Sequence, residues 1–188
     1  EGVAAAKAQV RSLEGMLSII PTQTKRTKEM DEFQQFSTPP HYAFVANWVA
    51  NLQKSDDYLE PSAGIGGLAI FGKIAGVNSV TVNELSGRRL ALLNELPFDN
   101  HFSENAEQID NILPDHIKPT VIVMNPPFSA TAGTQATAPS ISSRHLIGSK
   151  RAAVWLQSSV KGWPMISRLS VNGGEKSSEP TMFVLILE

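Results

Sequence analysis

The stretch D-Y-L-E-P-S-A-G-I-G-G, residues 57–67, decides the fold of this 188-residue chain. Its first four residues predict a short strand, and the glycine-rich turn leads into residues 68–75, which have a helical pattern that stops at Gly76. Gly64 and Gly66 allow the backbone to turn tightly and to approach a ligand closely. The amino end of the following helix directs its positive dipole into the same space. Taken alone, the segment is equally typical of a plain strand-to-helix turn.

Strand and helix alternate downstream of this turn. The expected strands cover 57–60, 79–82, 98–102 and 120–124, and the expected helices between them cover 68–75, 86–95 and 106–113. This order predicts an α/β fold, a doubly wound and mostly parallel sheet with helices on both faces. Ligands of such sheets bind at the carboxyl ends of the strands.

The flanking regions define the expected domain organisation. Residues 2–20 predict an amphipathic helix that ends at Pro21, and residues 22–32 are a polar connector, so 1–32 stand apart from a main domain at 33–188. Residues 41–53 predict a helix before the first strand. Beyond residue 143, a helix is expected at 144–160 and strands at 165–171 and 182–187. The chain begins at Glu1 rather than Met, which indicates a piece of a longer protein.

Composition limits the function classes. A hydrophobic content of 41% suits a globular domain, and a formal charge of −2 with dispersed Lys and Arg neither indicates nor excludes nucleic-acid binding. The chain has no cysteine, and its four histidines lack partners at metal-ligand spacing, so no metal site is expected. No apolar run reaches the length of about 18 residues that a membrane span needs. No signal peptide is recognisable, so we expect a cytoplasmic location.

Glu84 ends the second expected strand, 18 residues beyond Gly66. In dinucleotide-binding folds, an acidic side chain at this place accepts hydrogen bonds from two ribose hydroxyls. NAD and S-adenosyl-L-methionine (SAM) share this diol, so Glu84 alone leaves both cofactors open.

The tetrapeptide Asn125-Pro126-Pro127-Phe128 directly follows the buried strand V-I-V-M. Two consecutive prolines hold the backbone rigid. They would direct the Asn125 amide oxygen and the Pro126 carbonyl to one point, where they accept the two N–H bonds of an exocyclic amine. The nitrogen lone pair would then face an electrophile, and Phe128 would offer a flat face to a planar ring. A proline-stiffened loop without function is the alternative.

With F-S-T-P-P at 36–40, these motifs occur in a known order. The sequence resembles the amino-methyltransferases, in particular the adenine-N6 DNA methyltransferases of the γ arrangement. More narrowly, it is similar to methylase-like domains of plasmids and phages that lie beside Strawberry notch-type helicase regions. The resemblance covers residues 33–133. It implies a Rossmann-like, SAM-dependent enzyme that methylates N6 of adenine in DNA, with the target base flipped out of the duplex.

The resemblance also implies residue roles. Catalysis falls to Asn125, Pro126, Pro127 and Phe128, and no metal is required. The SAM site would comprise Phe36, Thr38, Pro39, Glu60, Pro61, Ser62, Ala63, Gly64, Gly66, Glu84, Asn105, Ala106 and Asn125. An Asp is usual in the family where Asn105 stands.

The carboxyl-terminal part departs from the family pattern. Only 60 residues follow Phe128, where a helix, a fifth strand and a strand hairpin are usual. Residues 150–180 lack the usual Leu-x-x-Gly-Gly turn into an apolar strand, because Gly173-Gly174 is followed by the polar run 175–179. No separate target-recognition domain is present. These departures indicate a truncated or altered copy, with a helicase or recognition region outside this chain.

Other functions remain open. The domain is also compatible with a non-catalytic SAM- or nucleic-acid-binding module of a helicase-linked protein. N-P-P-Y/F is shared with RNA guanine-N2 and protein glutamine methyltransferases, and the F-x-T-P-P element is what favours DNA. A nicotinamide-dependent oxidoreductase is disfavoured because the turn is not G-x-G-x-x-G.

Overall fold

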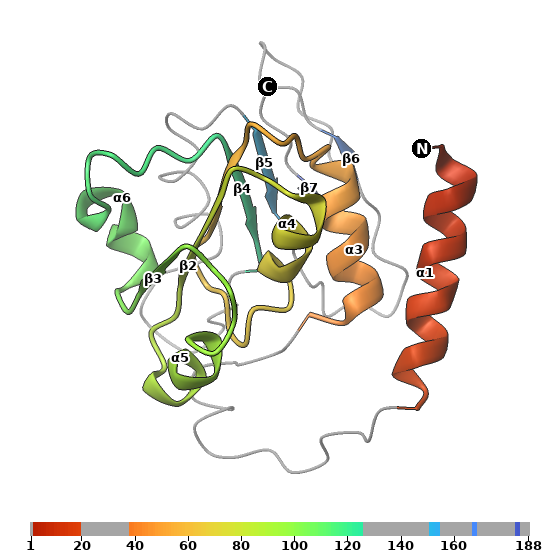
Figure 1. Ribbon diagram of the computed structural model, residues 1–188, viewed down its shortest axis with the longest axis horizontal. Helices are drawn as coiled ribbons and strands as arrows, with labels where there is room; N and C mark the ends of the chain where they lie inside the picture. Colours follow the sequence, from red (N-terminus) through yellow and green to blue (C-terminus); the bar gives the residue numbers. More distant parts are fainter. Residues whose placement is uncertain (1, 20–37, 126–150, 155–166, 169–182, 185–188) are drawn as a thin grey trace.

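The computed structural model describes residues 2–19, 38–125, 151–154, 167–168 and 183–184. A five-stranded sheet of order β3-β2-β1-β4-β5, parallel throughout, forms its centre (Figure 1). The strands are β1 (Asp57–Glu60), β2 (Ser79–Asn83), β3 (Asn100–Phe102), β4 (Val121–Met124) and β5 (Arg151–Val154). The helices are α1 (Val3–Leu17), α3 (Pro40–Val49), α4 (Ala69–Ala75), α5 (Gly87–Leu93), the 3₁₀ turn η1 (Ala106–Gln108) and α6 (Ile109–Ile112). The predicted doubly wound parallel sheet is confirmed.

The core lies between the sheet and the helices α3 and α4. Strand side chains alternate between the two faces, so Tyr58 and Leu59 of β1 point to opposite sides, and both are buried. On the Tyr58 side, small side chains let the helices approach closely: a Cβ on Gly72 of α4 would lie 3.2 Å from the Tyr58 ring. The members of this core are Ala43, Ala46, Ala50, Tyr58, Ala63, Leu68, Ala69, Val77, Val80, Val82, Leu93, Phe98, Val121 and Val123.

The strand order in the sheet reverses at β1, because β2 and β3 lie on one side of it and β4 and β5 lie on the other. The chain first builds β1, β2 and β3 outward to one edge, and then crosses back to add β4 and β5 on the other side of β1. This order creates a topological switch point, where ligands of open α/β sheets bind at the carboxyl ends of the strands. The glycine-rich turn, Glu84 and Asn125 each directly follow one of these strand ends.

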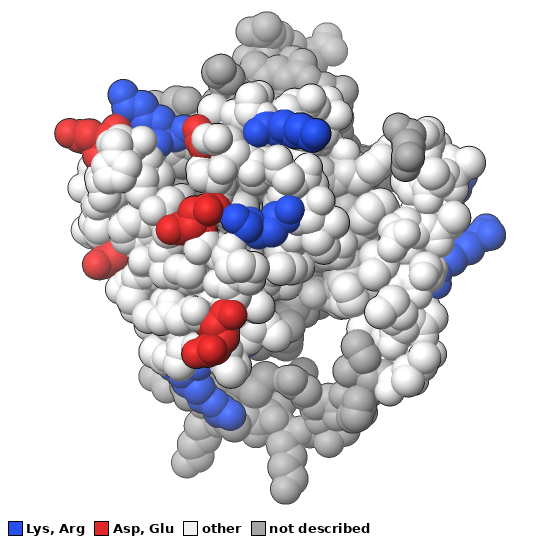
Figure 2. Space-filling model, in the orientation of Figure 1, with Lys and Arg blue, Asp and Glu red and all other residues white. Residues whose placement is uncertain are grey.

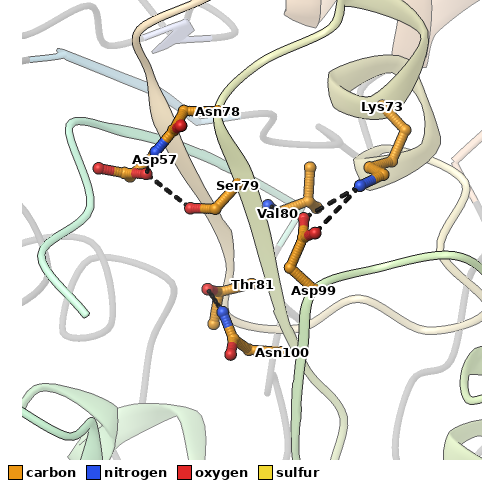
Figure 3. A network of polar contacts seen from close by, with 8 residues as sticks. All are labelled: Asp57, Lys73, Asn78, Ser79, Val80, Thr81, Asp99 and Asn100. Carbon is orange, nitrogen blue, oxygen red and sulfur yellow. Dashed lines mark hydrogen bonds and ion pairs between the residues drawn. The ribbon is translucent and has the colours of Figure 1, made fainter. Parts of the chain in front are cut away.

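A polar network joins the amino ends of the strands, at the edge opposite the switch point (Figure 3). Asp57 Oδ1 accepts hydrogen bonds from Asn78 Nδ2 at 2.7 Å and from Ser79 Oγ at 2.6 Å. Asp99 Oδ2 accepts from the Val80 N–H at 2.7 Å and forms an ion pair with Lys73 of α4 at 3.0 Å. These contacts tie β1, β2, α4 and the start of β3 together, and we assign them a structural role.

One predicted element is wrong where the structure describes it. A helix was expected over 144–160, but residues 151–154 form β5, which pairs with β4 in the register Val121↔Arg151 to Met124↔Val154. The two alanines of R-A-A-V favour a helix locally, but pairing with β4 decides the conformation. A fifth strand is therefore present. The short strands β6 (Ser167–Arg168) and β7 (Phe183–Val184) fall within the predicted strands and pair in parallel, unlike a hairpin.

The amino-terminal helix and the remaining helices match their predicted positions, with ends shifted by a few residues. α1 lies beside α3 at the side of the sheet (Figure 1). α4 ends where Gly76 adopts a left-handed conformation with φ 72°, which glycine takes at little cost. Within the described residues, no helix combines the length and the apolar character that crossing a bilayer requires.

Candidate functional site

The glycine-rich turn adopts a conformation that only glycine fits. Gly64 and Gly66 have φ angles of 59° and 85°, in the left-handed region. A Cβ on Gly66 would lie 2.9 Å from both Leu96 Cδ1 and Phe98 Cε2. The turn thus packs against the segment that follows α5, and a side chain at residue 66 would require Leu96 and Phe98 to shift.

Glu84 fastens this turn to the end of β2. The Gly64 N–H donates to Glu84 Oε2 at 2.7 Å, and the Ser86 N–H donates to Glu84 Oε1 at 2.8 Å. The carboxylate is only 9% exposed. Each carboxylate oxygen can accept two hydrogen bonds, so each retains a lone pair for a ligand hydroxyl. Its orientation is therefore set by the backbone before any ligand arrives.

Asn83, the last residue of β2, joins the loops that follow β1 and β3, and it was not among the predicted site residues. Its Nδ2 donates to Pro61 O at 2.8 Å and to Glu104 O at 2.9 Å, while its Oδ1 accepts from the Glu104 N–H at 2.8 Å. The Ala63 N–H donates to Asn83 O at 2.8 Å. A buried amide at the end of an apolar strand is the signal that marks such a residue.

Glu60, at the end of β1, is buried beneath the turn. Its Oε2 accepts the Ala69 N–H of α4 at 2.8 Å. Burial raises the pKa of Glu60 well above its ordinary value, the Ala69 hydrogen bond opposes this shift, and the negative charge of Glu84 adds to it. A positively charged ligand group near this carboxyl would favour its ionised form.

Thr38 and Asn125 meet although 87 residues separate them. Asn125 Nδ2 donates to Thr38 Oγ1 at 2.9 Å. Pro39 follows Thr38 and is the N-cap of α3, where its carbonyl accepts the Ala43 N–H at 2.9 Å. The structure thus brings two motifs of the sequence analysis together at the switch point.

The other predicted site residues divide into two groups. Pro61, Ser62 and Ala63 form the turn itself, and Asn105 and Ala106 begin the 3₁₀ turn after β3, close to the Asn83 hydrogen bonds. Phe36, Pro126, Pro127 and Phe128 lie outside the described residues.

Two exposed apolar residues directly follow the two residues of the Gly64–Glu84 hydrogen bond, and neither was predicted. Leu85 is 56% exposed directly after Glu84, and Ile65 is 41% exposed directly after Gly64. The Arg89 guanidinium lies close to the same turn, since a Cβ on Gly64 would be 3.2 Å from Arg89 Nη1. A large apolar residue next to a strand-end acid is a signal that sequence inspection can use.

This set of groups suits a nucleoside ligand. Glu84 offers two acceptors for a ribose diol, and Leu85 and Ile65 offer apolar surface for a base. In the part of the chain that the structure describes, no three His, Asp or Glu side chains gather as metal ligands would.

Comparison with known proteins rests on the fold. No family model matches the sequence, and no curated protein matches it by sequence. A Pyrococcus horikoshii protein provisionally named an RNA methyltransferase superposes with a TM-score of 0.61 at 16% identity, covering 79% of this chain and 72% of its own.

Two further solved structures agree with this similarity. TrmN from Thermus thermophilus gives a TM-score of 0.52 at 20% identity, covering 65% of this chain and 40% of TrmN. A Thermoplasma acidophilum protein gives a TM-score of 0.50 at 14% identity, covering 68% and 65% of the two chains. The chain therefore has the Rossmann-like fold of the SAM-dependent methyltransferases.

Proposed function

We propose that this domain is a SAM-dependent methyltransferase that acts on an exocyclic amine. The observation that carries the proposal is the meeting of three features at one switch point: the glycine-rich turn, the Glu84 carboxylate that is bonded to it at the end of β2, and Asn125 at the end of β4. Each feature is ordinary alone, but their combination on this fold is suited to a nucleoside cofactor next to an amine acceptor.

The residues present fit SAM. Glu84 would accept hydrogen bonds from the ribose hydroxyls, Leu85 and Ile65 would contact the adenine ring, and the turn at 61–66 would enclose the methionine end. When bound, SAM would supply an electrophilic methyl group on a sulfonium sulfur, with a neutral thioether as the leaving group for transfer to the amine nitrogen.

The protein's part in the reaction is to position the amine. Asn125 would accept one N–H of the amine, and the Pro126 carbonyl would accept the other, so that the lone pair points at the methyl carbon. The nitrogen loses one proton to solvent after transfer. Alignment of this kind accounts for a large part of catalysis in reactions between two bound molecules.

Adenine N6 in DNA is the substrate we favour, because F-S-T-P-P, E-P-S-A-G, Glu84 and N-P-P-F follow one another in the order of that methyltransferase family. On the face drawn in Figure 2, basic and acidic side chains of the described residues are interspersed. The proposal therefore rests on the strand-edge site rather than on a basic surface. A helicase or recognition region outside this chain, in a plasmid or phage protein, would supply duplex contacts.

RNA is the second candidate. Two observations favour RNA: the Pyrococcus horikoshii protein is named for activity on RNA, and RNA amine methyltransferases also contain N-P-P-Y/F. A non-catalytic SAM-binding module is a third outcome that the same experiment identifies.

The test supplies methyl-labelled SAM with DNA or RNA as acceptor, followed by nucleoside analysis of the product. We expect labelled N6-methyl-2′-deoxyadenosine from DNA, and loss of label in Asn125→Ala at a SAM concentration that saturates the variant. Asn94→Ala, at an exposed residue after α5, is the matched control and should transfer normally. Label in RNA alone would overturn the DNA assignment, and SAM binding without transfer to either acceptor would indicate the module.

A further inference from the structure

We infer that Thr38 is a positioning residue that orients the Asn125 carboxamide so that its oxygen alone is presented to the acceptor amine. This inference rests on the proposed function and deepens it. The resemblance implies only a cofactor contact for Thr38, whereas the structure places its hydroxyl 2.9 Å from Asn125 Nδ2.

The position of Thr38 is fixed by elements that pack independently of Asn125. Pro39 and Pro40 follow it and start α3, whose inward residues Ala43 and Ala46 are fully buried. Asn47 of the same helix donates through Nδ2 to Leu68 O at 3.2 Å, which ties α3 to the end of the glycine turn. The backbone that carries the Thr38 hydroxyl is therefore held in place by α3.

Asn125, in contrast, has a fixed backbone and a side chain with a choice of orientation. It directly follows β4, all four residues of which are buried. The last torsion of an asparagine side chain is broad and roughly two-fold, so the amide can present either its oxygen or its nitrogen in a given direction. Only one of these orientations accepts a hydrogen bond from an amine.

In the structure, the amide has the orientation in which Nδ2 donates to Thr38 Oγ1. Because Nδ2 is held by Thr38 Oγ1, Oδ1 points away from Thr38 as an acceptor. An acceptor oxygen suits a donor such as an exocyclic amine and disfavours a carbonyl or ring nitrogen. Thr38 would thus contribute to the selection of the methylated atom without touching the substrate.

Thr38 also lies close to the glycine-rich turn, since a Cβ added on Gly67 would be 3.7 Å from the Thr38 carbonyl oxygen.

The kinetic test compares Thr38→Val, which keeps the shape and removes the hydroxyl, with Thr38→Ser, which keeps the hydroxyl. We expect Thr38→Val to lower kcat by about 10- to 100-fold, as misplacement of a positioned group does, with the dissociation constant for SAM nearly unchanged. Thr38→Ser should restore turnover. In an Asn125→Ala background, Thr38→Val should have no further effect.

The opposite pattern would overturn the inference. If Thr38→Val weakens SAM binding and its effect multiplies with that of Asn125→Ala, then Thr38 contacts the cofactor and does not act through Asn125.

A second readout does not depend on activity. In ¹H–¹⁵N spectra, the Asn125 side-chain amide, assigned by its disappearance in Asn125→Asp, should show two separated and protected protons in the wild type and in Thr38→Ser. In Thr38→Val, these signals should exchange faster and move toward each other, while the backbone spectrum reports an intact fold. Unchanged Asn125 signals in Thr38→Val would refute the inference. If no methyl is transferred but the signals respond as expected, the proposed function fails and the inferred contact stands.

Discussion

Replacing Gly66 by alanine tests the geometry of the glycine-rich turn, and Gly76 supplies a matched control. Both glycines have left-handed backbones, with φ 85° and 72°. A Cβ on Gly66 would lie 2.9 Å from Leu96 Cδ1 and from Phe98 Cε2, whereas a Cβ on Gly76 would meet nothing within 4 Å. The difference between the two variants isolates the steric clash from the backbone strain.

The magnitudes follow from these two contributions. A left-handed conformation costs an alanine about 1–2 kcal/mol, and this is the whole expected loss for Gly76→Ala. Inserting a methyl group into a packed site costs a further 1–3 kcal/mol, roughly. We therefore expect Gly66→Ala to lower the free energy of unfolding by about 2–5 kcal/mol, a large share of the roughly 5–15 kcal/mol typical of a domain.

Urea unfolding measures this difference directly. Both variants should lower the midpoint at an unchanged slope, with the larger decrease in Gly66→Ala. Calorimetry with SAM should show weakened binding only in Gly66→Ala. Equal losses of stability in the two variants would refute the reasoning, since they would mean that the turn does not press against Leu96 and Phe98.

Three further predictions concern carboxylates. Glu84→Gln should weaken SAM binding by roughly 10- to 100-fold, through loss of a charged hydrogen bond, while Glu95→Gln on the exposed surface should not, as calorimetry would show. Burial raises the pKa of Glu60; the Ala69 hydrogen bond opposes this shift, and the charge of Glu84 adds to it. The free energy of unfolding of the wild type should therefore fall relative to that of Glu60→Gln as pH rises from the ordinary glutamate pKa through the raised one. A difference in unfolding free energy that does not change with pH would contradict this. Partial burial acts to raise the pKa of Asp99, but the hydrogen bonds from Val80 and Lys73 outweigh burial, so the pKa is lowered. Asp99 should therefore stabilise the fold fully above the ordinary aspartate pKa and not at all below the lowered pKa. The urea midpoints of the wild type and Asp99→Asn should then converge only in acid.

Local patterns were sufficient to predict most of the sheet. β4 is a short apolar run, β2 is rich in β-branched residues, β1 directly precedes the glycine-rich turn, and Gly76 ends α4 where the sequence indicated. Such signals lie within a few residues of the element that they define, so one sequence carries them. The alternation of strand and helix then determined the edge at which Glu84 and Asn125 lie.

The features that sequence reasoning missed depend on contacts between distant segments. R-A-A-V at 151–154 contains two good helix formers, and only pairing with β4 makes it a strand. Asn83 is one polar residue among several until its three hydrogen bonds to residues 61 and 104 are known. The contact between Thr38 and Asn125 likewise joins motifs that the sequence placed far apart.

The most direct measurement of the central claim is a single-turnover assay at saturating SAM, comparing the wild type with Asn125→Ala on an adenine-containing acceptor. We expect methyl transfer to an exocyclic amine in the wild type, and a rate at least about 100-fold lower in Asn125→Ala when both proteins are saturated with SAM. Equal rates in the two proteins would contradict it, because the site at the end of β4 would then have no part in the reaction.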